Sequence, residues 1–381
     1  MFIKTSRQGE RPLGKIDASL NEKLQNVKWG EYETSELFTL QKIKNKLSKD
    51  DLSDNFTFPA YSAESENGGV IGYSKTPEFI CDDKSPIYIT FGDHTRTFNI
   101  VEESFSVLDN VKVLKPHIQN KRALLFIISA WQKLIPNLGY ARHWKVAKGC
   151  LLLLPTKDNK IDFDFIESFI AELEARHIAE LEAYLIVTGL KDYTLTKEEE
   201  KALEDFNTLN WTSYNLEALF GKSTRGKRLK SADRVQGDLS FVTAGEACEG
   251  VSAYIGNDVD IFESNTITID MFGSAKYRNF RYGADDHVAV VHTEKLPKHA
   301  AVFVTTAIHK SSHTGKFDYS RNFYAKDADE LDILLPTNEN KPDYLFMATL
   351  ISAIQKLVIK DVVLYADRKI GETKAIVAKK N

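Results

Sequence analysis

One stretch of this chain is present twice, and the repetition limits what the chain can fold into. Residues 153–162, LLPTKDNKID, recur at 334–343 as LLPTNENKPD, and residues 28–38, KWGEYETSELF, recur at 210–220 as NWTSYNLEALF. Between these markers, YSAESENGGVIGY at 61–73 matches TAGEACEGVSAYI at 243–255. Self-similarity over so long a period indicates two copies of one module of about 180 residues, rather than a solenoid of short repeats.

Both copies follow the same order of elements. Each begins with an amphipathic segment led by Trp29 or Trp211, and about 110 residues of short β-like runs and turns follow. An LLPT strand then leads into a helix, with Asp162 or Asp343 where an N-capping acid belongs. In the first copy this helix should run from about Asp162 to Thr188. The pattern predicts an α+β fold, a tandem duplication of a β-rich domain followed by a long helix.

Each of these helices carries one apolar stripe at helical spacing. We expect the helices to pack on each other through these stripes, antiparallel, as a spacer; alternatively, each helix covers only the sheet of its own domain. His177 interrupts the first stripe, and we interpret it as a packing residue rather than a metal ligand. The stripes consist of Ile166, Ile170, Leu173, His177, Leu181 and Tyr184, and of Met347, Ile351, Ile354, Val358, Val362 and Tyr365.

Charge and cysteine content narrow the class of protein. The formal net charge is −4, so a nucleic-acid surface would have to gather its basic residues on one face. The three cysteines include no CxxC pair, which is typical of the reducing cytosol. The N-terminus has no apolar signal region, and the longest apolar run, ALLFIISAW at 123–131, is too short to cross a bilayer. These features predict a cytoplasmic protein without a membrane partner.

The sequence lacks the motifs of common enzymes. GKS at 221–223 is not a phosphate-binding loop, because Leu216 stands where that motif needs glycine. No GxSxG, HExxH or GxGxxG is present. His309 and His313 have the spacing of metal ligands, but no third ligand is evident. We therefore predict no catalytic residue and no metal site in this chain.

Two basic runs stand at matching places in the two copies. The first is QKIKNKLSK at 41–49 and the second is GKSTRGKRLK at 221–230, which contains no acidic residue. Clustered cations beside Ser, Thr and Gly suit phosphate contacts, so we predict DNA binding here; the alternative is a pair of solvated basic turns. The predicted contacts are Lys42, Lys44, Lys46, Lys222, Arg225, Lys227, Arg228 and Lys230.

A second candidate surface follows the first β-rich half of each copy. FGDHTRTF at 91–98 offers His94, Thr95 and Arg96, and FGSAKYRNFR at 272–281 offers Lys276, Tyr277, Arg278 and Arg281. Such donors suit phosphates and guanine edges. Because the copies differ here, these residues are predicted to read unlike half-sites. Shared residues should instead belong to the scaffold, and on this reasoning we interpret Tyr140, Arg142, Tyr319 and Arg321 as structural.

The tract YSAESENGGVIGY, with ITFGDHTRTFNIVEESFSVLDNVKVLKP after it, resembles the DNA specificity subunits of type I restriction–modification systems. The linker VTGLKDYTLTKEEEKAL at 187–203 is similar to the separate specificity subunits of BcgI-like (type IIB) enzymes. The resemblance spans essentially the whole chain, although FGSAKYRNF departs from the pattern, and it adds Tyr61 and Ser62 to the candidate DNA contacts. It implies an N-terminal segment at 1–27, target-recognition domain 1 at 28–160, a spacer helix and linker at 161–209, target-recognition domain 2 at 210–341 and a C-terminal spacer helix at 342–381.

The same resemblance implies a function. Each domain would read one half of a split site in double-stranded DNA, and the helices would dock a methyltransferase/endonuclease subunit. S-adenosylmethionine and Mg²⁺ would act in that partner, with no cofactor in this chain. One alternative is a specificity subunit of a three-subunit type I system, and another is an unrecognised nuclease that uses Asp93 and His94. The Gly68-Gly69 pair is expected to form a sharp turn between two strands rather than a cofactor site.

Overall fold

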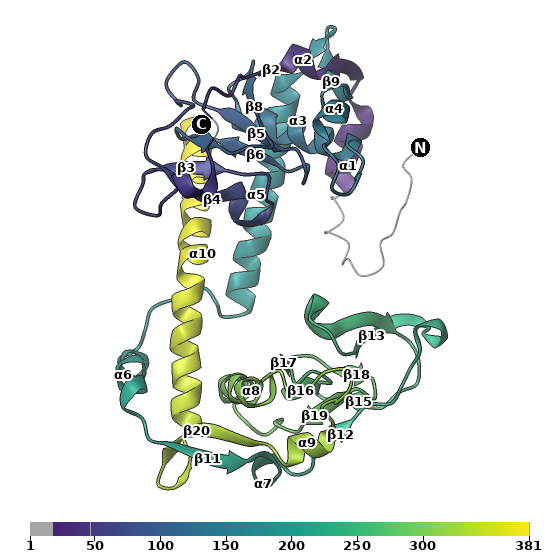
Figure 1. Ribbon diagram of the computed structural model, residues 1–381, viewed down its shortest axis with the longest axis vertical. Coiled ribbons are helices and arrows are strands. Elements are labelled where there is room, and N and C mark those ends of the chain that lie inside the picture. Colours follow the sequence, from purple (N-terminus) through teal and green to yellow (C-terminus); the bar gives the residue numbers. More distant parts are fainter. Residues whose placement is uncertain (1–17, 46, 381) are drawn as a thin grey trace. The chain divides into compact units, whose positions relative to one another are not determined.

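The structure is a computed structural model that describes residues 18–45 and 47–380 (Figure 1). The described residues form two compact units, which divide after Glu180. We call them the first and the second unit; each contains the β-rich part of one copy of the repeat. The boundary falls inside a continuous helix, α5, so its last residues belong to the second unit.

The first unit contains three small sheets, in the strand orders β1-β9-β10, β2-β8-β5-β6 and β4-β3-β7. The elements from α1 to α5 are α1 (Ala18–Asn26), β1 (Trp29–Glu33), α2 (Thr34–Leu37), β2 (Phe38–Leu40), β3 (Phe58–Tyr61), β4 (Val70–Ser74), β5 (Tyr88–Gly92), β6 (Phe98–Val101), β7 (Ser106–Val107), β8 (Val111–Pro116), α3 (Lys121–Leu134), α4 (Trp144–Ala147), β9 (Leu151–Lys157), β10 (Lys160–Ile161) and α5 (Phe163–Val187).

The second unit repeats this arrangement, with the strand orders β11-β20-β21, β12-β19-β16-β17 and β14-β13-β18-β15. Its elements after α5 are α6 (Lys197–Asp205), β11 (Trp211–Asn215), α7 (Leu216–Phe220), β12 (Thr224–Arg225), β13 (Gln236–Val242), β14 (Val251–Ile255), β15 (Ile261–Phe262), β16 (Thr266–Asp270), β17 (Ala275–Arg278), β18 (Tyr282–Ala284), β19 (Val288–Val291), α8 (Lys298–Ser312), α9 (Ala325–Asp329), β20 (Asp332–Asn338), β21 (Lys341–Pro342) and α10 (Tyr344–Lys380).

Strand register shows how closely the copies correspond. Trp29 faces Pro155 across β1 and β9, and Trp211 faces Pro336 across β11 and β20. The parallel pair β3–β7 of the first unit has its counterpart in the parallel pair β13–β18 of the second. The repeated sequence therefore folds into the same local structure in both units.

The main core of the first unit lies between α3 and the four-stranded sheet. The cap residue Asn120 accepts a hydrogen bond from the amide of Ala123 at 3.0 Å and starts α3. Apolar residues at helical spacing then bury one face of α3, and Trp131 at its end is fully buried, with Nε1 donating to the Ala147 carbonyl at 2.8 Å. In the second unit α8 presents Val304 and other buried residues to an equivalent core.

The long helices begin where the sequence predicts. The first runs over Phe163–Val187, within one residue of the predicted bounds. Asp162 accepts a hydrogen bond from the amide of Phe165 at 2.9 Å, and Asp343 accepts one from the amide of Phe346 at 2.9 Å. Both predicted N-caps are therefore confirmed.

The apolar seam differs from the predicted stripes. In the second unit, Leu185 at the end of α5 packs on α10 through Val363 and Ala366, all three fully buried. Val358 of the predicted stripe is instead 74% exposed. Tyr184, Val362 and Tyr365 are also exposed, and so is His177, which is therefore not a packing residue. Ile166 and Met347 of the predicted stripes are fully buried, and Leu181 packs against the Leu185 cluster, so the stripes are buried at some positions and exposed at others.

No helix within the described residues is long and apolar enough to cross a membrane.

Candidate nucleic-acid interface

The Gly68-Gly69 pair lies in the turn that joins β3 to β4. Asn67, Gly68 and Gly69 all have a positive φ (46°, 61° and 82°), a conformation that glycine adopts without steric cost. The Ser62 amide donates to the Gly69 carbonyl at 2.8 Å and closes the turn. The predicted sharp turn between two strands is confirmed.

The second unit builds the same turn with different residues. Cys248, Glu249 and Gly250 have φ values of 49°, 55° and 80°, and the Thr243 amide donates to the Gly250 carbonyl at 2.8 Å. Cys248 and Glu249 are consecutive non-glycine residues with left-handed backbone dihedral angles. Such residues store backbone strain, which is common in binding loops. The backbone path is thus shared, while the side chains that it displays differ between the copies.

An acidic hollow of about 510 Å³ lies beside the β3–β4 turn. Asp54, Glu64 and Glu66 line it, together with Lys49, which pairs with Glu64 at 3.4 Å. Carboxylates repel phosphates but accept hydrogen bonds from cytosine amino groups. This hollow therefore does not suit the DNA backbone.

The two basic runs occupy equivalent places in the fold. The first follows β2, and the second contains β12; both strands form the edge of a four-stranded sheet. In the second run the chain passes close to β18 of the neighbouring sheet at Gly226, and the Lys227 amide donates to the Ala284 carbonyl at 3.1 Å. A Cβ at position 226 would lie 1.7 Å from the Ala284 oxygen, so only glycine permits this approach.

Most cations of the two runs are exposed and available. Two of them form ion pairs: Lys49 pairs with Glu64 at 3.4 Å, and Lys227 pairs with Asp260 at 2.9 Å, although all four side chains remain largely exposed. Lys46 lies outside the described residues. Among the described residues, no ion pair involves Lys42, Lys44, Lys222, Arg225, Arg228 or Lys230, and all six are exposed. Their contact with DNA remains a prediction, and their exposure is compatible with it.

Side-chain hydrogen bonds hold the β5–β6 turn (93–97), both within the turn and to the segment that follows α3. His94 Nδ1 lies 2.9 Å from the Tyr140 carbonyl, and the hydroxyls of Thr95 and Thr97 lie 2.6 Å apart. Arg96 has a φ of 61°, and its Nη1 donates to the Ile135 carbonyl at 3.1 Å. All these side chains are half-buried, so each keeps part of its surface for a ligand.

The corresponding stretch of the second unit is more internal than predicted. Arg278 is 1% exposed; its Nε donates to Thr268 Oγ1 at 2.9 Å, and its Nη1 has no partner. Burial lowers the pKa of this guanidinium. The predicted contact of Arg278 with DNA is therefore not supported, because this side chain packs between Thr268 and the Tyr282 ring.

The neighbours of Arg278 are also engaged. Lys276 donates to Ser274 Oγ at 2.9 Å and pairs with Glu246 at 3.1 Å. Hydrogen bonds from Ser274 and Lys276 lower the pKa of the Glu246 carboxyl. The Tyr277 hydroxyl donates to Asn265 Oδ1 at 2.9 Å.

Arg281 is exposed and pairs with Glu263 at 3.2 Å. Of this predicted group, Arg281 alone presents an exposed charge, so the second unit offers less of a reading surface here than the sequence suggested.

The candidates Tyr61 and Ser62 lie at the end of β3. Tyr61 is 8% exposed and packs edge-on against Phe105, and burial raises the pKa of its phenol. It belongs to the core, so its predicted contact with DNA is not supported. Ser62 is half-buried, and its hydroxyl accepts from the Glu64 amide at 3.1 Å.

The residues considered for catalysis or metal binding have structural roles. Asp93 is 2% exposed and accepts a hydrogen bond from the Trp144 amide at 2.6 Å. His309 Nδ1 accepts from the Ala275 amide at 3.1 Å, and His313 Nδ1 lies 3.2 Å from the Phe272 carbonyl. Asp93 is therefore not available as the carboxylate of a nuclease site. His309 and His313 both lie against backbone groups rather than in a metal site.

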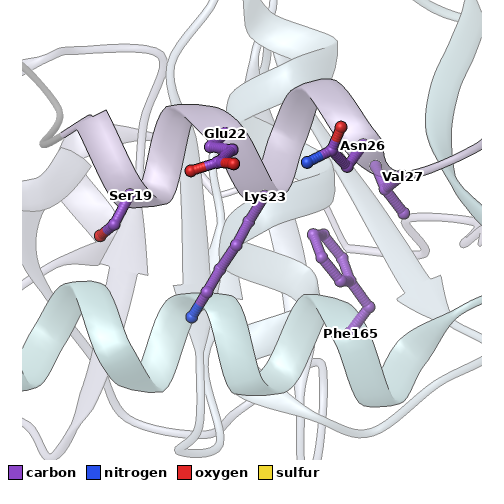
Figure 2. Close-up of a pocket in the computed structure, with 6 residues that line it drawn as sticks. All are labelled: Ser19, Glu22, Lys23, Asn26, Val27 and Phe165. Carbon is purple, nitrogen blue, oxygen red and sulfur yellow. The ribbon is translucent and has the colours of Figure 1, made fainter.

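A second hollow, of about 470 Å³, lies between α1 and the start of α5 (Figure 2). Ser19, Glu22 and Asn26 of α1 line it, and Phe165 closes it from α5. Lys23 reaches across to pair with Glu172 of α5. This hollow holds one acid and one base and shares no residue with either basic run, so it marks the packing of α1 on α5.

Sequence reasoning misjudged one pair of residues. Tyr140 is 97% exposed and Tyr319 is 86% exposed, so neither has the scaffold role predicted from its repetition. Arg142 is also exposed, whereas Arg321 does have a structural role, because it forms a two-pronged ion pair with Asp327. Repetition alone could not separate residues that hold the fold from residues that share a function.

Comparison with known proteins gives three similarities. Residues 26–183 match the family described as the type I restriction modification DNA specificity domain. The specificity subunit S.BcgI of the type II restriction enzyme BgcI from Heyndrickxia coagulans is 23% identical over 299 residues, covering 74% of this chain and 83% of that protein. The crystal structure of the type-I restriction-modification system S subunit from M. genitalium has a TM-score of 0.55 and 14% identity, over 92% of this chain and 94% of that one. The similarity in fold thus extends over both copies of the repeat.

Proposed function

We propose that this chain is a DNA specificity subunit of a restriction–modification system and that its two copies read the two halves of a bipartite site in double-stranded DNA. The match of residues 26–183 to the type I restriction modification DNA specificity domain and the similarity to S.BcgI support this proposal. The observation that carries the proposal is one local fold built twice with different side chains on equivalent loops. Asn67 and Gly68 stand where the second unit has Cys248 and Glu249, at nearly equal φ values. A common scaffold with unlike loops suits two half-sites of unlike sequence.

We assign the domains as target-recognition domains at 28–160 and 210–341, joined and followed by spacer segments at 161–209 and 342–381. The two long helices form the spacer and run antiparallel. The 25 residues of α5 span about 38 Å, close to the ~34–36 Å of one turn of B-DNA. The proposed site therefore consists of two different half-sites about one helical turn apart, with unspecified base pairs between them.

The partner in this proposal is a methyltransferase/endonuclease subunit that docks on the helices. Large apolar side chains of the helices are exposed, which supports a protein interface; they include Tyr184, Ile186 and Val187 of α5 and Leu357, Val358 and Leu364 of α10. S-adenosylmethionine and Mg²⁺ act in that partner, and this chain performs no catalysis. The similarity to S.BcgI favours a BcgI-like system over a three-subunit type I system.

The decisive experiment expresses the chain with its partner subunit and sequences the methylated positions of the host DNA. A split, non-palindromic motif is expected only when both chains are present. A single continuous motif would contradict the bipartite reading. Cleavage of DNA by the purified chain with Mg²⁺ alone would instead support the nuclease alternative.

A further inference from the structure

Two tyrosines are displayed at the tips of equivalent loops, one in each unit. Tyr140 lies between α3 and α4, and Tyr319 lies between α8 and α9. Among the side chains that the structure describes, their exposed fractions of 97% and 86% are the highest of any large apolar or aromatic residue in their units, apart from Val187 at the end of α5. A ring so exposed contributes little to folding, so its presence in both copies needs another reason.

Equivalent backbone hydrogen bonds attach the two loops to the rest of their units. The amides of His143 and Phe323 donate to the carbonyls of Asp93 and Met271, both at 2.9 Å. Asp93 and Met271 each follow the last residue of an equivalent strand, β5 or β16. His143 and Phe323 are also both fully buried, so the attachments correspond in burial as well as in hydrogen bonding.

The next residue of each turn contacts the tyrosine itself. His94 Nδ1 lies 2.9 Å from the Tyr140 carbonyl, and the Phe272 ring meets the Tyr319 ring edge-on at 5.3 Å. Each tyrosine is therefore held beside the turn that follows β5 or β16, which is the predicted reading turn of that unit.

Charge around the tyrosines favours an anionic ligand. Residues 110–157 contain no acidic residue, and Arg142 and Lys145 next to Tyr140 are exposed. Residues 295–317 also contain no acid, and Lys316 is exposed; the acid next to Tyr319, Asp318, accepts hydrogen bonds from Ser320 and Arg321. In a chain with a net charge of −4, two acid-free stretches beside the same feature are a local property of these loops.

We propose that Tyr140 and Tyr319 contact the phosphodiester backbone of duplex DNA, one beside each half-site, independently of base sequence. This contact rests on the proposed function, in which the two units read different bases but meet the same DNA backbone. Residues that differ between the copies can supply the reading, and an exposed residue common to both suits the shared backbone. The phenol hydroxyl donates to a phosphate oxygen, and Arg142 adds a charge contact in the first unit.

Binding of the full chain to a mixed-sequence duplex and to its own site tests this assignment. Tyr140→Ala and Tyr319→Ala should each lower affinity roughly three- to tenfold on both DNAs, as expected for one lost hydrogen bond. Preference for the site should stay unchanged. Arg142→Ala should also reduce the salt slope by about one. Tyr184→Ala is the control: it removes another exposed tyrosine, on α5, and should leave DNA affinity unchanged.

Several results would overturn the inference. Unchanged affinity in both tyrosine variants, with normal thermal melts, would show that the rings do not touch DNA. Unchanged DNA affinity with loss of partner-subunit capture would show that they bind protein instead. A loss confined to one half-site sequence would make them reading residues. If the parent chain binds all DNA sequences equally, the proposed function itself is wrong. If the parent prefers one site and the tyrosine variants bind that site as tightly as the parent, only the proposed tyrosine contacts are wrong.

Discussion

Glu199 of α6 and Lys356 of α10 form an ion pair of 2.9 Å in which both side chains are largely buried, with 8% and 17% exposed. The Glu199 carboxylate also accepts from Ser352 Oγ at 2.6 Å and from the Thr196 amide at 2.8 Å, which completes a capping box. Figure 1 shows α6 alongside α10. One side chain thus starts the linker helix and fastens it to the long C-terminal helix.

Removal of this side chain should loosen α6. Glu199→Ala leaves Ser352 and the Thr196 amide without their acceptor, and should lower the free energy of unfolding by about 1–3 kcal/mol, the usual range for hydrogen bonds to a charged group. Glu199→Gln retains an oxygen acceptor and should cost less. Glu200→Ala, on the exposed side of the same helix, is the control, and urea unfolding measures all three. Equal stability of the Ala variant and the parent would contradict a holding role.

The corrected helix seam makes a separate prediction. Leu185→Asp and Val363→Asp each place an unpaired charge at a fully buried position, and should destabilise the second unit by several kcal/mol, roughly 3 or more. Val358→Asp changes a residue that is 74% exposed and should melt like the parent.

The same variants distinguish the seam from the docking surface. If the exposed face of α10 binds the partner subunit, Val358→Asp should keep its melting temperature and lose the partner in pull-down. Parent-like melting of Leu185→Asp would refute the seam.

The basic run of the second unit should bind DNA without regard to sequence. Arg228 is exposed and lacks an ion-pair partner among the described residues, so Arg228→Ala should lower the slope of log affinity against log salt by about one on every duplex. Lys227→Ala should lower this slope by less, because Asp260 already neutralises part of the Lys227 charge. Lys326→Ala, at another exposed lysine paired with Glu330, is the control. An unchanged slope for Arg228→Ala would place this run away from the DNA.

The accuracy of sequence reasoning depended on the kind of feature. The repeated module, the helix caps at Asp162 and Asp343 and the Gly68-Gly69 turn were predictable, because each rests on local backbone chemistry. The helix seam was not, since a helix with apolar residues on several faces leaves the buried face to tertiary packing.

The sequence also did not predict which polar residues are buried. Residue type does not reveal how deeply a strand is buried: three of the four residues of β3 are buried, and so are both end residues of β17. Arg278 and Tyr61 are therefore buried although their types suit DNA contacts. Tyr140 was misjudged for the opposite reason, because its repetition was taken as a sign of structural need.

Burial of Arg278 predicts an unusual response to mutation. Its Nε donates to Thr268 but its Nη1 has no partner, and replacement of buried charged groups by apolar side chains of similar volume is often neutral or stabilising, by up to ~4 kcal/mol. Arg278→Met should therefore melt at or above the temperature of the parent, and DNA affinity should remain within about twofold because no DNA contact is lost. Loss of one half-site preference with unchanged melting would restore a reading role for Arg278.

The second unit should lose stability below neutral pH through His309. Burial, and to a lesser extent the neighbouring His313, lower the pKa of this imidazole from its ordinary value of 6.5; Glu246 and Asp270 oppose the shift, and Lys276 adds to it. Protonation would also break the hydrogen bond that Nδ1 accepts from the Ala275 amide. The unfolded chain therefore binds this proton more tightly, so stability should be complete above pH 6.5 and decrease as the pH falls below it.

Melting temperatures between pH 7.5 and pH 5.5 measure this dependence. His309→Asn keeps an acceptor for the Ala275 amide without a titrating group, so its melting curve should shift less with pH than that of the parent. His177→Asn, at an exposed position, is the matched control. If His309→Asn and the parent lose stability equally on acidification, other groups control the acid response, and the half-buried imidazole of His309 is not the cause.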